Sequence, residues 1–239
     1  MSALTDSHCH FLPGVDDGAA EEKESLGILR LLREQGVERV TATPHYVNHR
    51  DTVPAFLERR AEAMERLKAA AQERGVSLPP IALSAEVRLE KGLAEVEGLD
   101  ALRYEGTRYI LLELPFVPFK NWMREEIDNI AYRFSLTPVL AHLDRYDWYS
   151  RDEVEELLER DDTVYQFNCS AFAEKKAAMK TALRLIKEER PVLLGSDAHS
   201  LDKRPPRFAE TEKVLRSKLK GHYEDFVRRS DALLADAFR

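Results

Sequence analysis

The chain has 239 residues, with 36 lysines and arginines against 43 aspartates and glutamates, so its formal net charge is −7 with neutral histidines. Hydrophobic residues make up 44% and charged residues 33%, which is enough apolar material for a large core and excludes intrinsic disorder as the main state. The acidic balance gives no support for a protein that holds phosphate backbones on a basic surface, so nucleic acid is not an expected partner.

Short apolar runs alternate with longer amphipathic segments along almost the whole chain, a pattern typical of successive βα units. In chain order, the pattern predicts strands at residues 4–8, 37–44, 80–86, 108–114, 137–142, 163–168 and 191–196. Helices are predicted at residues 21–35, 53–74, 120–133, 151–159, 174–189 and 204–219, with a last one from residue 223 onward. Residues 89–104 are less regular and predict a loop with one helical turn.

No linker rich in glycine, serine or proline divides the chain and no repeat is visible, so we expect a single domain over residues 1–239. Seven βα units form either a parallel barrel or a doubly wound open sheet, and the alternation alone does not choose between them. The first βα junction, HCHFLPGVDDGA, lacks the glycine patterns that cradle nucleotide phosphates. A dinucleotide or ATP site is therefore disfavoured.

The two cysteines, Cys9 and Cys169, lie far apart in the sequence, and neither belongs to a CxxC pair. This argues against a disulfide framework or a structural zinc knuckle and fits a reducing cytoplasm. The N-terminal residues lack a basic segment followed by a long apolar run, and no stretch approaches about 18 consecutive apolar residues. We therefore expect a cytoplasmic protein that is neither secreted nor inserted in a membrane.

Imidazoles and carboxylates lie at or just past the C-terminal ends of the predicted strands. They are His8, His10, His45, Glu86, Glu113, His142, Asp197 and His199. In parallel α/β folds these strand ends converge on one face, where active sites are built. One such histidine alone is usually a surface or hydrogen-bonded residue. So many ligand-type residues at the same end of six strands predict a site for more than one metal ion.

The residue types and their spacing indicate which ions would bind. Residues i and i+2 at a strand end point the same way, so His8 and His10 can bind one ion while Cys9 faces elsewhere. Glu86 and Glu113 end apolar runs, where a buried charge is costly unless it is paired or metal-bound. A mixed set of nitrogen and oxygen ligands without thiolates suits manganese, zinc or iron, and eight or nine ligands suit two or three ions.

The adjacent carboxylates Asp16 and Asp17 precede a predicted helix in the turn sequence PGVDDGA. An Asp-Asp-Gly turn often serves only as a turn and helix cap, and that role is sufficient for one of the two. Because His45 and His199 need a third partner, one aspartate of the pair is a reasonable ligand.

The motifs HCH, TPH and SDAH, with a histidine at the fifth strand, resemble the PHP superfamily, named for polymerase and histidinol phosphatase domains. More narrowly, DSHCHFLPGVDDGA, ATPHYV, SAEVRL, LLELPF, VLAHLDRY, QFN and LLGSDAHSLDKRPPRF are similar to segments of the bacterial Mn-dependent tyrosine phosphatases encoded with capsular and exopolysaccharide genes. The similarity is collinear from residue 6 to residue 208. It implies an α/β fold, a distorted (β/α)7-type barrel with a trinuclear metal site at the C-terminal strand ends, and manganese as the first metal to expect.

The resemblance also implies how the ligands divide among the ions. One ion would take His8, His10, Glu86 and Asp197; a second Glu86, Glu113 and His142; and a third Asp17, His45 and His199. Arg145 in HLDR and Arg204 in DKRPP match two arginines that the family places near the metals. Guanidinium groups there would hold a phosphoryl dianion and offset charge that develops in the transition state.

Other residues near these strand ends are candidates for substrate contact. Asn168 ends the sixth strand, where it would either donate a hydrogen bond to the substrate or serve in packing. Tyr46 follows the second strand and would wall an aromatic cleft or pack within its loop, as would Phe116, Phe119 and Trp122.

A cysteine-based tyrosine phosphatase needs the motif Cys-x5-Arg, but Val15 follows Cys9 at that distance and Lys175 follows Cys169. Neither cysteine therefore fits as the nucleophile. Divalent ions lower the pKa of a bound water from ~15.7 to ~7, so we expect a metal-bridging hydroxide to attack the phosphorus of phosphotyrosine in line. His199 or a metal-bound water would then protonate the leaving group.

Three other functions compete with a protein-tyrosine phosphatase. The same centre would serve a phosphatase of histidinol phosphate or another small molecule. A non-catalytic, metal-bound interaction module would lack a ligand, whereas every expected ligand is present, and the acidic charge disfavours a nuclease. In the resembling family the substrate is the tyrosine-rich tail of a polysaccharide-assembly kinase, so a tyrosine-phosphorylated protein is the expected partner. A homo-oligomer is compatible with all of these features.

Overall fold

The computed structural model describes residues 4–146 and 149–239, and its strands form a curled, parallel sheet in two sections. One section has the order β1-β2-β4, with β1 at Thr5–Cys9, β2 at Arg39–Ala42 and β4 at Ile81–Leu83. The other has the order β3-β5-β6-β7-β8-β9, with β3 at His45–Tyr46, β5 at Glu86–Arg88, β6 at Tyr109–Glu113, β7 at Thr137–Leu140, β8 at Val164–Asn168 and β9 at Val192–Gly195.

The two sections are joined because β3 continues the course of β2 after a two-residue break, and β5 continues that of β4 in the same way, so the strands predicted at residues 37–44 and 80–86 extend further than expected. Backbone hydrogen bonds cross the interruption: the Ser84 amide donates to the Ala42 carbonyl at 2.9 Å, and the Glu86 amide donates to the Pro44 carbonyl at 3.0 Å. Pro44 has no amide hydrogen to donate, which accounts for a break in the ladder at this position.

At the other edge β9 returns to β1. The Asp197 amide donates to the His8 carbonyl at 2.8 Å, and the His10 amide donates to the Ala198 carbonyl at 3.0 Å. Each of the seven predicted strands therefore neighbours two others, and all their pairings are parallel. The prediction of a distorted (β/α)7-type barrel is confirmed, and the doubly wound open sheet is excluded.

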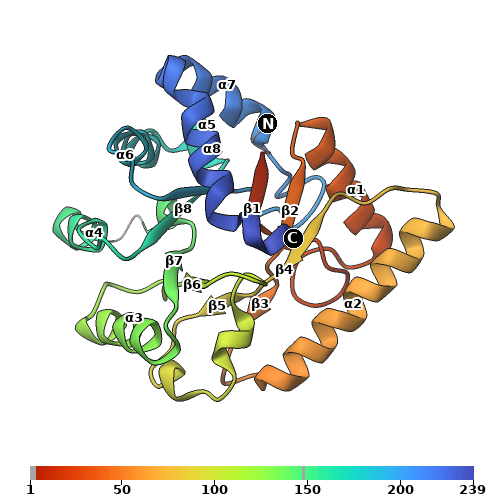
Figure 1. Ribbon diagram of the computed structural model, residues 1–239, viewed down its shortest axis with the longest axis horizontal. Coiled ribbons are helices and arrows are strands. Elements are labelled where there is room, and N and C mark those ends of the chain that lie inside the picture. Colours follow the sequence, from red (N-terminus) through yellow and green to blue (C-terminus); the bar gives the residue numbers. More distant parts are fainter. Residues whose placement is uncertain (1–3, 147–148) are drawn as a thin grey trace.

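Helices surround the strands (Figure 1). They are α1 at Glu22–Glu34, α2 at Val53–Glu73, α3 at Asn121–Phe134, α4 at Arg151–Leu158, α5 at Ala171–Glu174, α6 at Lys176–Lys187, α7 at Phe208–Leu219 and α8 at Tyr223–Leu234. Short 3-10 turns occur at η1 Leu93–Glu95, η2 Leu99–Leu102, η3 Leu143–Arg145, η4 Lys220–His222 and η5 Ala235–Phe238. Within the described residues, no helix combines the length and the apolar character that a bilayer span requires.

Two predicted helices differ from the observed ones. The helix predicted from residue 204 begins only at Phe208, because Pro205 and Pro206 hold the preceding backbone out of a helical conformation. The helix predicted at residues 174–189 is divided at Lys175 into α5 and α6. The predicted loop at residues 89–104 carries two 3-10 turns, η1 and η2, rather than one helical turn.

Alternation along the strands produces two separate hydrophobic clusters. One lies between the strands and the helices and includes Ile110, Leu112, Leu140, Tyr165 and Phe167. The side chains at the intervening positions form the second cluster, inside the barrel. It consists of Leu111, Val139, Ala141, Val164 and Leu193, together with Tyr104 and with Leu234 of α8. Apolar side chains thus fill the interior, and the same inward register carries polar residues toward the C-terminal strand ends.

Candidate metal centre

The nine residues predicted as metal ligands lie together at the C-terminal ends of the strands. Strand alternation explains the placement: His8 and His10 share the inward face, while Cys9 between them packs in the outer cluster. Glu113 follows Leu111 of the inner cluster two residues along β6, and Glu86 opens β5. Residues distant in sequence therefore meet because each strand ends at the same level.

Glu86 lies at the middle of this group. Its Oε2 is 3.1 Å from Nε2 of His8, 3.1 Å from Nε2 of His10 and 3.1 Å from Nδ1 of His45. Its Oε1 is 2.7 Å from Nε2 of His142. The side chain is 1% exposed, so the carboxylate is held away from water. This is the geometry expected of a carboxylate shared between ions.

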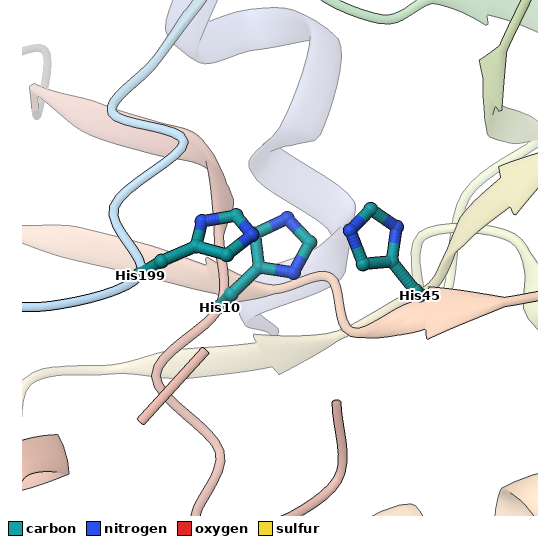
Figure 2. A group of neighbouring side chains, drawn as sticks. All are labelled: His10, His45 and His199. Atoms are coloured by element: carbon teal, nitrogen blue, oxygen red, sulfur yellow. The ribbon is translucent and has the colours of Figure 1, made fainter. Parts of the chain in front are cut away.

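The other predicted ligands gather on either side of Glu86. Nε2 of His142 is 3.5 Å from Oε1 of Glu113. Oδ1 of Asp17 is 3.4 Å from Nε2 of His45 and 3.5 Å from Nε2 of His199. Figure 2 shows the imidazole of His10 between those of His199 and His45, and its ring centroid is 3.9 Å from the first and 4.6 Å from the second.

The donor set fits divalent cations. Among the described residues, the buried polar atoms without a hydrogen-bond partner include Glu86 Oε2, Asp197 Oδ1 and His199 Nε2. Leaving such an atom unsatisfied costs about 1–3 kcal/mol, and a cation removes that cost. The Nε2 atoms of His8 and His10 also face each other at 3.0 Å, close to Asp197 Oδ1 at 3.8 and 3.6 Å. These atoms form one of the groups whose donors all lie within 4.8 Å of one another.

Partners on the far side of the imidazoles fix their orientation. Nδ1 of His10 is 2.7 Å from Asp16 Oδ2, and Nδ1 of His8 is 3.1 Å from Gln166 Oε1. Nδ1 of His199 is 3.0 Å from the Asp197 carbonyl oxygen. Each Nδ1 can donate to an oxygen, which leaves the lone pair of Nε2 facing the centre, as is usual for histidines that bind metals.

Asp16 and Asp17 differ in their surroundings. Asp16 is largely buried, and besides His10 it accepts hydrogen bonds from the amides of His45 and Gly18, each at 2.9 Å. The Asp17 side chain is 71% exposed and contacts imidazoles only through Oδ1. Asp17 therefore has a ligand's position, whereas Asp16 orients His10 and shapes the turn. The sequence analysis missed the first of these two roles of Asp16.

Gln166 was also missed, although it lies two residues before Asn168 on the inward face of β8. Its Oε1 accepts a hydrogen bond from the His142 amide at 2.5 Å, and its Nε2 donates to Asn168 Oδ1 at 3.0 Å. Asn168 Nδ2 in turn donates to Asp197 Oδ2 at 2.8 Å. Asn168 is thus committed to positioning Asp197, and one amide network links three of the predicted ligands.

The backbone at two of the predicted ligands is strained. His142 has a φ of 30° and Asp197 a φ of 50°, both in the left-handed region that side-chain-bearing residues rarely adopt. The Gln166 side chain holds the His142 amide, and the His8 carbonyl holds the Asp197 amide. Such strain costs on the order of 1–3 kcal/mol and commonly marks functional sites.

Both predicted arginines converge on Asp197. Nη2 of Arg204 is 2.7 Å from Asp197 Oδ2, and Nη1 of Arg145 is 3.3 Å from the same atom. They line a cleft of about 710 Å³ that reaches His45, Glu113 and the exposed ring of Phe116. The guanidinium carbon of Arg145 lies 4.9 Å from the centre of that ring. The positively charged guanidinium groups of Arg145 and Arg204 therefore lie at the wall of the cleft, next to the carboxylate of Asp197.

Two histidines of the centre, His142 and His199, have pKa values shifted in opposite directions. Burial alone lowers the pKa of His142, but hydrogen bonds with Glu113 and Glu86 raise it to about 10. His199 behaves differently, because burial and the neighbouring His10 lower its pKa to about 4. A histidine that is neutral near pH 7 suits a ligand better than the proton donor that the sequence analysis considered.

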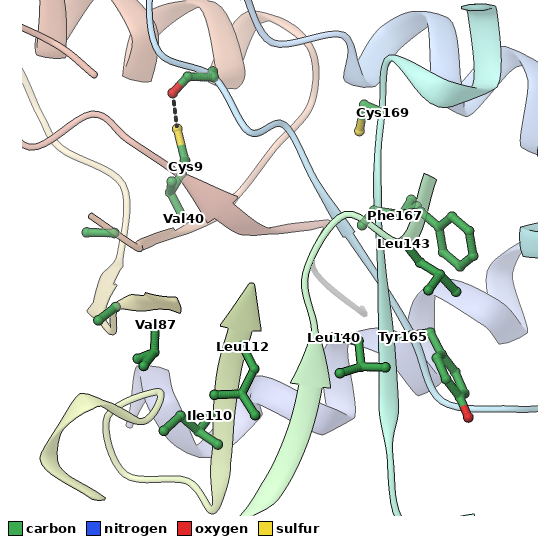
Figure 3. Packing of buried hydrophobic residues seen from close by; sticks show 14 of the residues in the cluster. Cys9, Val40, Val87, Ile110, Leu112, Leu140, Leu143, Tyr165, Phe167 and Cys169 are labelled. Carbon is green, nitrogen blue, oxygen red and sulfur yellow. Dashed lines mark hydrogen bonds between the residues drawn. The ribbon is translucent and has the colours of Figure 1, made fainter. Parts of the chain in front are cut away.

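The two cysteines are free and buried in the outer hydrophobic cluster. Figure 3 shows Cys9 with its Sγ directed to the Ala198 carbonyl, at 3.8 Å. Cys169 lies in the same cluster, directly after the last residue of β8. Burial raises the pKa of both thiols well above the ordinary value. Neither side chain can supply a thiolate to the cleft, which agrees with the missing Cys-x5-Arg motif.

Tyr46 does not have the predicted position in the cleft wall. It is fully buried, its ring packs edge-on against Phe56 with centroids 5.4 Å apart, and its hydroxyl donates to Asn48 Oδ1 at 3.2 Å. The strand direction turns its side chain into the core, so its role is in packing. Phe119 and Trp122 are half-buried against the outer cluster and do not line the cleft, whereas Phe116 does.

A side chain at Gly195 would disturb the centre. A Cβ there would lie 2.5 Å from His8 Cβ and 2.6 Å from Gln166 Nε2. Overpacking of this kind costs about 1–3 kcal/mol, so Gly195→Ala should lower the free energy of unfolding by that amount and weaken metal binding. Urea unfolding of the metal-free protein and metal titration measure the two effects.

Gly221→Ala is the matched control, because a Cβ at Gly221 meets no atom within 4 Å. Its stability and its metal affinity should stay close to those of the wild-type protein. If Gly195→Ala behaved like this control in both measurements, the tight contact between β9 and β1 would be disproved.

Comparison with known proteins agrees with this geometry. The family described as "Capsular polysaccharide synthesis, CpsB/CapC" matches residues 4–233. The tyrosine-protein phosphatase CpsB of Streptococcus pneumoniae is 29% identical over 224 residues, which cover 90% of each chain. The tyrosine-protein phosphatase CpsB of Streptococcus agalactiae is 26% identical over 222 residues, which cover 89% of each chain.

Solved structures show the same fold. One from the study of YwqE of Bacillus subtilis and CpsB of Streptococcus pneumoniae, described as metal-dependent tyrosine phosphatases, matches with a TM-score of 0.80 and 24% identity. The match covers 98% of this chain and 95% of the other. A lactonase of Listeria monocytogenes is a more distant match, with a TM-score of 0.54 and 11% identity. Because the family match spans nearly the whole chain, the protein belongs to the CpsB/CapC family of capsular polysaccharide synthesis, as its motifs predicted.

Proposed function

We propose that this protein is a metal-dependent phosphatase that hydrolyses phosphotyrosine in proteins. The observation that carries the proposal is the convergence of Arg145 and Arg204 on Asp197 at the rim of a cluster of imidazoles and carboxylates. Relatives over most of the chain are named tyrosine-protein phosphatases. Two guanidinium groups next to a site that suits divalent metal ions can together bind a phosphoryl dianion.

Three ligand sets would hold the ions. They are His8, His10, Glu86 and Asp197; Glu86, Glu113 and His142; and Asp17, His45 and His199. We propose two or three ions, with manganese first and zinc or iron as alternatives, because the ligands are nitrogen and oxygen only. Bound there, the ions would activate a water nucleophile and offset the charge of the phosphate oxygens.

The protein's own groups orient the substrate. Arg145 and Arg204 would bind the non-bridging phosphate oxygens, since their guanidinium groups already lie at the wall of the cleft. The ring of Phe116 is 40% exposed and stands beside Arg145, which favours an aromatic ester over a small alkyl phosphate. A phenolate leaves readily because the pKa of tyrosine is about 10, so His199 is better assigned as a ligand than as an acid.

Membership of a capsular polysaccharide synthesis family supports a phosphorylated polysaccharide-assembly kinase as the physiological partner. We propose that it works in the reducing cytoplasm, with which the free thiols of Cys9 and Cys169 are compatible.

Chelation combined with a substrate panel tests the proposal. Removal of metal from the purified protein should abolish hydrolysis of a phosphotyrosine peptide, and manganese should restore it, with two or three ions per chain by elemental analysis. The Cys9→Ser and Cys169→Ser variants should keep their activity, because neither thiol reaches the cleft. Faster turnover of histidinol phosphate than of the peptide would instead establish a small-molecule phosphatase. Full activity without metal would contradict the proposal outright.

A further inference from the structure

The cleft above the metal centre carries more positive charge than one phosphate group needs. Its lining includes five arginines: Arg50, Arg59, Arg88, Arg145 and Arg204. The acidic lining residues Asp16, Asp17 and Glu113 contact the imidazoles of the centre or stand among its ligands. The outer part of the cleft is therefore cationic, apart from Asp51.

Three of the five arginines are already engaged. Arg145 and Arg204 contact Asp197, and Arg59 donates through Nη2 to Asp51 Oδ2 at 2.5 Å. Within residues 4–146 and 149–239, neither Arg50 nor Arg88 makes an ion pair with a carboxylate. Two guanidinium groups in the lining of the cleft are thus available to an anion from outside the protein.

Strand alternation explains where Arg88 lies. It follows Glu86 by two residues on β5, so both side chains project from the same face of the strand, and Arg88 is one step nearer the mouth. Its register partner on β6 is Glu113, another predicted ligand. The side chain is partly exposed and lines the cleft together with Phe116 and His45. Arg88 therefore lines the same cleft as the predicted ligands His45 and Glu113.

We propose that Arg88, assisted by Arg50, binds a carboxylate of an acidic residue that flanks the phosphotyrosine in the substrate protein. The inference rests on the proposed function and adds a substrate class to it: phosphotyrosine segments with acidic neighbours. The phosphoryl dianion is matched by the metal site with Arg145 and Arg204, so further cations along the cleft match a second, separate anion. A guanidinium group suits a carboxylate because its paired donors bind both oxygens.

Two phosphotyrosine peptides that differ only in flanking glutamates or glutamines test this subsite. For the manganese-loaded wild-type protein, kcat/KM should be about threefold to fivefold higher for the acidic peptide, as expected of one partly exposed charge pair. In Arg88→Gln this ratio should fall to about one, with unchanged metal content and unchanged turnover of p-nitrophenyl phosphate, which has no flanking residues. The wild-type preference should shrink at high salt, because solvent screens exposed charges.

Arg108→Gln is the matched control, since Arg108 is an exposed arginine just before β6, at the opposite end of the barrel. It should keep the wild-type ratio. An equal rate for both peptides in the wild-type protein, or an unchanged ratio in Arg88→Gln, would overturn the subsite. A parallel loss on p-nitrophenyl phosphate would assign Arg88 to the phosphoryl group and also overturn it. Hydrolysis of the neutral peptide tests the proposed function separately; if neither peptide were hydrolysed, both proposals would fail.

Discussion

Glu86→Gln should reduce phosphatase activity by at least about a hundredfold, because loss of a partner outside the ligand shell already costs 10- to 100-fold in metal affinity or activity. The carboxylate lies 3.1 Å from nitrogens of His8, His10 and His45 and 2.7 Å from His142. The amide keeps the size of the side chain but loses its charge and replaces one oxygen with a donor. The substitution therefore removes the proposed shared ligand with little change in packing.

Metal titration separates this effect from misfolding. Manganese should raise the thermal midpoint of the wild-type protein, because an ion that binds only the folded state stabilises it, and this rise should be much smaller in Glu86→Gln. Glu90→Gln is a matched control, since Glu90 is not among the predicted ligands. Its Oε1 pairs with Nδ1 of the exposed His49 at 2.6 Å. A Glu86→Gln protein with normal metal content and activity would rule out Glu86 as a shared ligand.

The candidate ligands could be predicted because their placement depends on local rules. A strand end and the alternation of side chains decide which residues point inward, and His8, Glu113 and Asp197 follow from these rules alone. The prediction that Tyr46 lines the cleft was wrong, and the same rules explain why. The strand pairing that turns the His45 side chain toward the centre turns that of Tyr46 into the core. A residue next to a ligand along a strand faces the opposite side.

The strand pattern alone could not predict closure of the barrel, which only the family resemblance implied, because closure depends on contacts between distant parts of the chain, such as the Asp197 amide on the His8 carbonyl. The interruption between β4 and β5 is equally non-local. Arg60 of α2 is buried there, and its Nη1 donates to the Ser84 carbonyl at 2.6 Å. An arginine in the middle of an amphipathic helix gives no sign of such a contact in the sequence.

The residues that orient the ligands were missed for a further reason. Gln166 is an uncharged residue inside a predicted strand, and its contacts with His8 and His142 form only when the closed barrel brings β1, β7 and β8 around one interior. Arg88 could have been found, since Glu86-Val87-Arg88 repeats the i, i+2 spacing of His8-Cys9-His10. This spacing predicts that Arg88 lies on the same face of the strand as Glu86, but it does not predict the cleft that Arg88 lines.

Arg204→Met should lower kcat by about 10²–10³, the usual cost of removing one preorganised donor to transition-state charge, while metal content stays unchanged. Asp197 would still be held through Oδ2 by Asn168 at 2.8 Å and by Arg145 at 3.3 Å, so its Oδ1 remains aimed at the centre. Steady-state kinetics with a phosphotyrosine peptide and elemental analysis measure the two quantities. Arg30→Met, at a side chain that is 76% exposed on α1, is the control for the same substitution.

The Arg145→Met variant and the double variant show whether the two guanidinium groups act on the same phosphate. Because both contact Asp197 Oδ2, the double variant should lose less activity than the product of the two single losses. Metal loss in Arg204→Met would mean that this arginine holds Asp197 in place rather than the substrate. Losses that simply multiply, with metal intact, would place the two arginines on independent groups of the substrate and contradict a shared phosphoryl site.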